Sequence, residues 1–128
     1  MFEATTAAYI FSFFAAIVML FQLALALGAP WGEMAMGGKY PGRFPPKLRV
    51  GAIMQMLLLA FFGLVVLTRA GLIFSDFLEV SKSAIWFVVV MCVVSAILNI
   101  ITPSKKERKL WSPVTIVLAV CALIVAWN

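Results

Sequence analysis

Four long apolar runs, separated by short charged segments, decide what this chain can fold into. A helix needs about 20 apolar residues to cross the roughly 30 Å hydrocarbon core of a bilayer, with about 17 as the lower limit. The runs that qualify cover about residues 6–28, 50–68, 84–101 and 111–127. All ten Lys and Arg residues and all five Asp and Glu residues lie outside them. The pattern predicts an all-α fold, an integral membrane four-helix bundle that forms one transmembrane domain over residues 1–128.

The composition excludes several other classes of protein. Hydrophobic residues make up 65% of the chain and charged residues 12%, whereas a soluble domain has about 45–50% and about 25%. Histidine is absent, which removes the usual general base and the commonest metal ligand. Cys92 and Cys121 lie in apolar runs without a CxxC partner. We therefore expect no enzyme, no cofactor and no metal site, since no paired acids or nucleophile with a base can be assembled.

The basic residues are distributed unevenly and predict the orientation of the bundle. Eight of the ten fall in residues 29–49 and 102–110, which lie on one side of a four-span protein. The positive-inside rule predicts that these two segments are cytoplasmic loops. Both termini are then expected on the outer side of the cell (inner) membrane. We expect the eight side chains to meet anionic lipid headgroups rather than nucleic acid.

The segment between the second and third runs has a mixed character. Its apolar residues fall on one side of a helical projection, and its two acids fall on other faces: Ile73, Phe74, Phe77 and Leu78, with Asp76 and Glu79. That spacing fits a short helix lying in the outer membrane interface. A plain turn whose apolar residues touch the headgroups fits equally well.

Uncharged polar residues recur near the cytoplasmic ends of the predicted helices. At 1.5 Å per residue, one from each helix lies roughly 4–9 Å below the same membrane surface: Gln22, Gln55, Asn99 and Thr115. They are interpreted either as hydrogen-bonding contacts between helices, worth around 0.6 kcal/mol each, or as the floor of a polar pocket that opens inward. The first interpretation is favoured because none of the four side chains ionises.

The first cytoplasmic loop, GAPWGEMAMGGKYPGRFPPKLR over residues 28–49, is rich in Gly and Pro and predicts turns rather than a helix. Turns are expected at Gly37-Gly38. A salt bridge from Glu33 to Arg49 or to Arg108 would clamp the two basic loops together, and exposed pairs of this kind contribute about 0–1 kcal/mol. Glu107 is a further candidate residue of this clamp. A solvated loop is the alternative. A phosphate held by the Gly37 and Gly38 amides and Arg49 is a third interpretation, although the spacing matches no phosphate loop.

Motif residues follow one another along the chain in a fixed order. They spell G-x-P-x-G-E, then G-G and P-x-x-L-R after the first run, and later L-N and S-x-x-E-R before a proline. The residues are Gly28, Pro30, Gly32, Glu33, Gly37, Gly38, Pro45, Leu48, Arg49, Leu98, Asn99, Ser104, Glu107, Arg108 and Pro113. The chain resembles small four-span bacterial integral membrane proteins of unknown function. The resemblance implies a bacterial source and directs attention to Glu33, Arg49, Asn99, Glu107 and Arg108.

Two functions of different classes follow from these patterns. Each run carries small residues at steps of three and four, a pattern typical of helix contacts within membranes. The first hypothesis is therefore a non-catalytic protein that acts by association, as a homo-oligomer or as an accessory subunit of a membrane complex. The alternative is a small solute or lipid transporter or binding protein with a polar pocket at the cytoplasmic end of the bundle.

Overall fold

The structure, a computed structural model, describes residues 3–128. It is an all-α bundle of four helices, each long and apolar enough to cross a membrane, as the sequence predicts. The helices are α1 (Ala4–Ala26), α2 (Pro46–Arg69), α3 (Leu78–Ile101) and α4 (Lys105–Trp127). Three short 3-10 turns complete the order: η1 (Gly32–Met34) and η2 (Met36–Gly38) between α1 and α2, and η3 (Ser75–Phe77) before α3.

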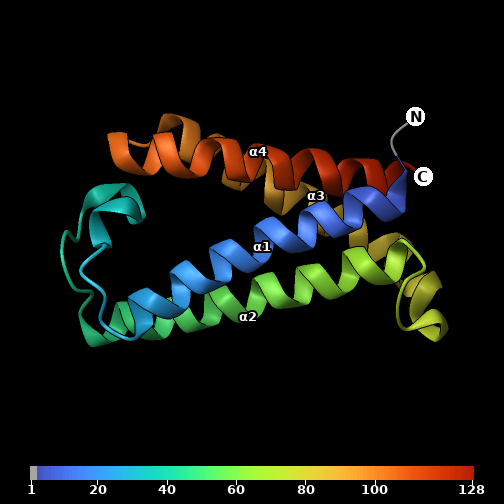
Figure 1. Cartoon of the computed structure of the whole chain (residues 1–128), viewed down its shortest axis with the longest axis horizontal. Coiled ribbons are helices and arrows are strands. Elements are labelled where there is room, and N and C mark those ends of the chain that lie inside the picture. The colour runs from blue at the N-terminus through green and yellow to red at the C-terminus, as the bar shows by residue number, and fades with distance from the viewer. Residues whose placement is uncertain (1–2) are drawn as a thin grey trace.

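Successive helices run antiparallel, so the first and last described residues lie at one end of the bundle (Figure 1). We call this end the closed end. The opposite end carries the segment of residues 27–45, the cap loop, and is called the loop end. The helices pack as two close pairs, α1 with α2 and α3 with α4, and the contact between α2 and α3 is much less extensive. The two pairs diverge toward the loop end, where the cap loop lies between them (Figure 1).

All four helices begin before the apolar runs, and the difference is largest, six residues each, for α3 and α4. The third was expected from residue 84 and the fourth from residue 111, but α3 begins at Leu78 and α4 at Lys105. Hydropathy marks only the part of a helix inside the hydrocarbon, whereas Lys, Glu and Arg are good helix formers that prolong α4 into the interface. The expected loop 102–110 is therefore wrong over most of its length, and only residues 102–104 connect α3 to α4. Helix α2 also begins earlier, with Pro46 at its first position, where a missing N–H costs nothing.

The segment between α2 and α3 forms neither the separate interfacial helix nor a plain turn. A tight turn follows Arg69, and η3 then continues without interruption into α3. Phe74 adopts a left-handed conformation, with φ of 45°, at the start of this element. The two phenylalanines of the segment, Phe74 and Phe77, are 58% and 61% exposed. In place of the predicted short helix, the structure thus has the 3-10 turn η3, which leads directly into α3.

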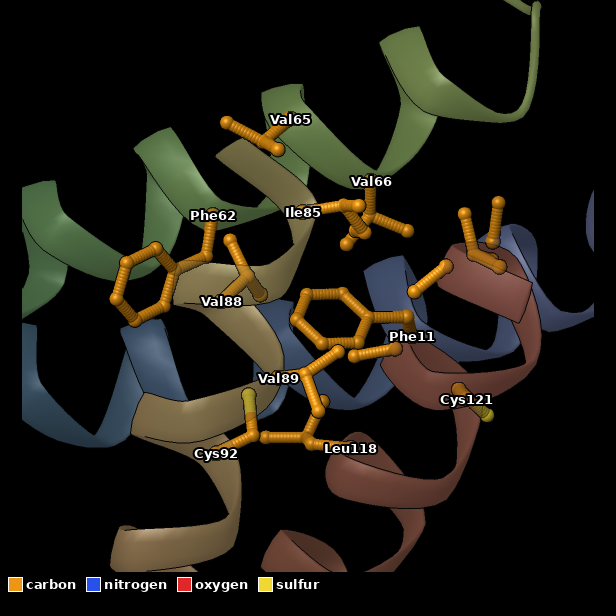
Figure 2. Packing of buried hydrophobic residues seen from close by; sticks show 14 of the residues in the cluster. Phe11, Phe62, Val65, Val66, Ile85, Val88, Val89, Cys92, Leu118 and Cys121 are labelled. Carbon is orange, nitrogen blue, oxygen red and sulfur yellow. The ribbon is translucent and has the colours of Figure 1, made fainter. Parts of the chain in front are cut away.

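The apolar core at the closed end is dense. Figure 2 shows the Phe11 ring at its centre, with Val66 and Ile85 on one side and Val89 and Leu118 on the other. Eight of its residues are 0% exposed: Ala7, Ala8, Phe11, Val66, Ile85, Val88, Ala122 and Val125. A second, smaller cluster at the loop end joins the cap loop to the helices through Phe21, Leu25, Phe44, Ala52 and Trp111. The two clusters remain separate, although Val18 and Val114 pack against both.

Candidate functional site

A cavity of about 790 Å³ lies at the loop end, between the two apolar clusters. Each of the four helices contributes residues to its wall, spaced three or four apart where a helix turns one face inward. The α2 face comprises Leu48, Ala52, Gln55, Leu59 and Phe62. The closed-end core forms the inner limit of the cavity, because Leu59, Phe62, Cys92 and Leu118 belong both to that core and to the cavity wall.

The four polar residues singled out by the sequence all lie on this wall: Gln22, Gln55, Asn99 and Thr115. Asn99 and Thr115 bond within their own helices, since Asn99 Nδ2 donates to the Ser95 carbonyl at 2.7 Å and Thr115 Oγ1 to the Trp111 carbonyl at 2.8 Å. Within residues 3–128, no hydrogen bond joins any two of the four, and the side chains of Gln22 and Gln55 have no hydrogen-bond partner. The layer therefore faces a space and does not fasten one helix to another.

The mouth of the cavity lies between α2 and α3. Its exposed wall residues come from these two helices, from the cap loop and from the connection between α3 and α4: Gly51, Gln55, Leu98, Ile101, Met36, Lys39 and Pro103. The helices α2 and α3 are also the neighbours that pack least extensively on each other. Gln55 lies nine residues after Pro46, about 14 Å along the helix axis. The opening therefore extends along α2 into the apolar part of this helix.

The cap loop is fastened to α4 by hydrogen bonds. Ser104 Oγ donates to the Glu33 carbonyl at 2.7 Å, and Trp111 Nε1 donates to the Met34 carbonyl at 3.0 Å. The Gly37 amide donates to Glu107 Oε2 at 3.3 Å. These contacts join residues seventy or more positions apart and hold the cap loop across the loop end of the bundle.

Glycines allow the cap loop to fold so closely on itself. A Cβ on Gly32 would lie 1.9 Å from the Tyr40 carbonyl oxygen, and the Gly32 amide donates to the Gly42 carbonyl at 2.9 Å. Gly37 and Gly38 have φ of 70° and 76°, in the left-handed region that favours glycine. The structure thus has turns at the Gly37-Gly38 pair, where the sequence predicts them.

The expected salt bridges from Glu33 to Arg49 and to Arg108 are wrong. Glu33 instead pairs with Lys106. Arg49 is engaged elsewhere, because its Nε donates to the Phe44 carbonyl at 2.9 Å and its guanidinium packs beside Gly28. Arg108 is exposed on the first turns of α4. The earlier start of α4 explains the change, because it places Lys106 on the first turn of the helix, within reach of the Glu33 carboxylate.

The phosphate interpretation of the loop also fails. The Gly37 amide is used by Glu107, and the Gly38 amide donates to the Ala35 carbonyl at 3.0 Å. Arg49 is bonded to Phe44, so its guanidinium is held on the α2 side of the loop. Both amides proposed for a phosphate therefore have protein partners, and one N–H group of the Arg49 guanidinium is also bonded.

The sequence names Glu107 as a candidate clamp between the loops, but the burial of its side chain and its contact with Gly37 were missed. Glu107 is only 8% exposed, and it lies on the cavity wall. The signal was its spacing from Ser104, which is typical of a capping box, and the Ser104 side chain does accept from the Glu107 amide at 3.2 Å. In a capping box the Glu side chain returns to the backbone of the cap residue, but here it reaches Gly37 in the cap loop. Within residues 3–128, Glu107 forms no salt bridge.

Comparison of the chain with protein-family models, with curated proteins and with solved structures found no match. The geometry of the cavity and of its cap is therefore the basis for any functional conclusion. Among the described residues, no group of three or more His, Cys, Asp and Glu side chains lies close enough together to hold a metal ion.

Proposed function

We propose that the protein is a membrane-embedded binding protein for an amphipathic molecule taken from the lipid phase, with the cavity between α2 and α3 as its binding site. The observation that carries the proposal is the unpartnered Gln22 and Gln55 on the wall of a cavity of about 790 Å³. Ligand sites typically measure about 300–1,000 Å³ and combine an apolar wall with a few polar groups.

The polar side chains support a ligand with a polar head. A polar group at membrane depth is costly unless it finds a partner. Asn99 and Thr115 find one in their own helices, but Gln22 and Gln55 do not. A ligand that donates and accepts hydrogen bonds would supply what these two amides lack.

The apolar part of the wall supports a ligand with a hydrocarbon portion. Leu59, Phe62 and Leu98 line the deeper and lateral parts of the cavity. Because the opening between α2 and α3 faces the membrane interior, a chain already in the bilayer can enter without crossing water. An amphipathic molecule fits both parts of the wall at once.

We also propose that the loop end faces the cytoplasm of a bacterial cell, in the inner membrane. Eight of the ten basic residues lie at this end, which the positive-inside rule places in the cytoplasm. The resemblance of the sequence to small four-span bacterial proteins supports a bacterial source. Its motif residues Glu33, Gly37, Ser104 and Glu107 all belong to the contact between cap loop and α4.

Association with a second copy or with a partner subunit is the weaker proposal. The small-residue pattern that suggested it is largely used inside the bundle. Ala15, Cys92 and Ala122 are members of the closed-end core. Inward packing accounts for these residues without a partner.

The test is the retention of lipid by the purified protein. After purification in mild detergent, the bound molecules are released and identified by mass spectrometry, and their amount per protein is measured. We expect about one bound amphiphile per chain, and a several-fold loss in Gln55→Leu and Asn99→Leu. The control is Met54→Leu, since Met54 neighbours Gln55 but is 66% exposed and not part of the cavity wall. If Gln55→Leu and Asn99→Leu retain as much lipid as the control Met54→Leu, the proposal is contradicted.

A further inference from the structure

We infer that the cavity selects a zwitterionic amphiphile, with a protonated amine at Glu107 and a phosphate near Lys39. Ethanolamine phospholipids are the membrane components with this chemistry. The inference rests on the proposed function and names its ligand class.

The charged lining of the cavity is the first observation. Among the residues that form its wall, one is acidic and one is basic: Glu107 and Lys39. Glu107 is 8% exposed, whereas Lys39 is exposed and lies where the cap loop borders the mouth. A ligand that complements both would place its cation inside and its anion outside.

The second observation is that Glu107 lacks a cation in the protein. A buried carboxylate is costly unless it is paired with a cation or well hydrogen-bonded. Four basic residues flank it in sequence, but all are exposed on other faces of α4: Lys105, Lys106, Arg108 and Lys109. The only side-chain hydrogen bond of Glu107 within residues 3–128 is the one from the Gly37 amide, at 3.3 Å. A carboxylate offers about four lone-pair sites, so it retains capacity for an ammonium group.

Aromatic rings beside Glu107 favour the same cation. Trp111 lies one helical turn after Glu107 on the cavity wall, and its ring packs against Phe21 with centroids 4.7 Å apart. Phe44 of the cap loop belongs to the same wall and the same cluster. Aromatic faces attract ammonium groups, most strongly where water is excluded. Glu107 and these rings thus form one wall suited to an amine.

The mouth favours an anion. Lys39 belongs to the cavity wall, and seven more basic residues lie at the loop end. A purely anionic headgroup would satisfy Lys39 but would bring a second negative charge toward Glu107. An amphiphile with a cation alone would satisfy Glu107 but would have to pass the basic rim. A phosphate joined to an amine by two carbons satisfies both.

The test compares three lysolipids with the same acyl chain on the full-length protein in detergent micelles. The probes are lysophosphatidylethanolamine, its N-acetyl derivative, which has no cation, and lysophosphatidylglycerol. Apparent affinities are measured by titration with native mass spectrometry. We expect the ethanolamine lipid to bind at least about tenfold more tightly than either of the others, because only its amine can form a charge-assisted hydrogen bond with Glu107.

Two variants then locate the discrimination. In Glu107→Gln the preference for the ethanolamine lipid should fall below about threefold, because the amide cannot pair with a cation. In Glu33→Gln, which alters the other acid of the loop end but not the cavity wall, the preference should persist. Persistence of the full preference in Glu107→Gln would overturn the assignment to this residue. If Glu107→Gln does not fold, the three probes on the unaltered protein still test the role of the ligand's charge.

The failures of the two proposals are distinguishable. If the N-acetyl derivative binds within about threefold of its parent while Gln55→Leu weakens both, the headgroup inference is overturned and the binding cavity stands. If none of the three probes binds above the level of Gln55→Leu, both proposals are contradicted.

Discussion

The two ends of the bundle are built from the same four helices but differ in packing, charge and connection. At the closed end, the helices meet directly around Phe11 and Ile85, which are 0% exposed (Figure 2). At the loop end the helix pairs diverge, and the cap loop occupies the gap (Figure 1). The closed end carries few charges, including the ion pair of Lys82 with Glu79 at 3.0 Å, whereas the loop end carries eight basic residues.

The difference shows how a small membrane protein can combine stability with a cavity. Direct packing of apolar side chains stabilises a membrane bundle, because lipid gives little hydrophobic driving force between helices. That packing is concentrated at the closed end. The loop end is held instead by hydrogen bonds between the cap loop and α4. We therefore expect substitutions at the closed end to lower the free energy of unfolding of the bundle, and substitutions at the loop end to open the cap loop locally.

The largest effect is expected at the closed end. Replacement Phe11→Ala empties the centre of the core, and we expect a loss of about 3 kcal/mol in the free energy of unfolding, at the lower end for buried Phe because lipid replaces water outside the bundle. Reversible unfolding in mixed micelles measures it. Phe13→Ala on the same helix is the control, since Phe13 is 63% exposed and should cost little. Equal losses in the two variants would mean that the closed end is not the stabilising region.

The next effect concerns the fold of the cap loop. Gly32→Ala places a methyl group 1.9 Å from the Tyr40 carbonyl oxygen, so the loop must open, at about 2 kcal/mol. We expect protease cleavage within the loop to become much faster while the helical circular dichroism melt changes little. Gly42→Ala is the matched variant, because its new Cβ meets nothing within 4 Å, and only its positive φ costs about 1 kcal/mol. Faster cleavage of Gly42→Ala than of Gly32→Ala would contradict the described loop.

A smaller effect is expected for one tether. Trp111→Phe retains an aromatic ring in the loop-end cluster but removes the indole donor to the Met34 carbonyl, 3.0 Å away. Loss of this hydrogen bond leaves the Met34 carbonyl without its partner, and the free energy needed to open the cap loop should fall by about 1 kcal/mol. Hydrogen exchange of the cap-loop amides measures the local opening. Trp31→Phe, at an exposed ring, should leave the exchange unchanged, and an equal response of the two variants would exclude the tether.

The smallest effect is expected for the ion pair of the loop. Glu33→Gln removes the pair with Lys106, whose partners are 47% and 66% exposed, and pairs of this kind contribute less than about 1 kcal/mol. We expect the melting temperature to fall by no more than a few degrees, with a smaller fall at high salt. Glu79→Gln removes the pair at the closed end as a comparison. A large loss in Glu33→Gln would mean that the side chain, and not the backbone of the loop, holds the cap.

The sequence was most informative where hydropathy and periodicity decide the structure. The four spans followed from the apolar runs, because the bilayer requires helices of that length. Helical rise alone brought Gln22, Gln55, Asn99 and Thr115 to one depth, and the structure places all of them on one cavity wall. Hydropathy does not indicate that a helix continues beyond the hydrocarbon into the interface. The predicted starts of α3 and α4 therefore lie six residues after the observed ones.

The cap loop was harder to predict because its contacts are tertiary. Glu33 had several basic residues within reach, and only the register of α4 selects Lys106. Glu107 carried a local signal, its spacing from Ser104, but that spacing predicts a bond within α4 and not the contact with Gly37. The burial of Glu107 beneath the cap follows from the divergence of the helix pairs, which no local pattern encodes.

The central claim is that the loop end holds a cavity open to the membrane between α2 and α3, and one matched pair of variants tests it directly. Gly51 lies on the cavity wall and Gly63 does not, and at both positions an added Cβ meets nothing within 4 Å. The amount of lipid retained by Gly51→Phe is compared with that retained by Gly63→Phe, each at equal folded yield. The expected result is a several-fold loss in Gly51→Phe and none in Gly63→Phe. Equal retention by both would contradict the cavity as the binding site.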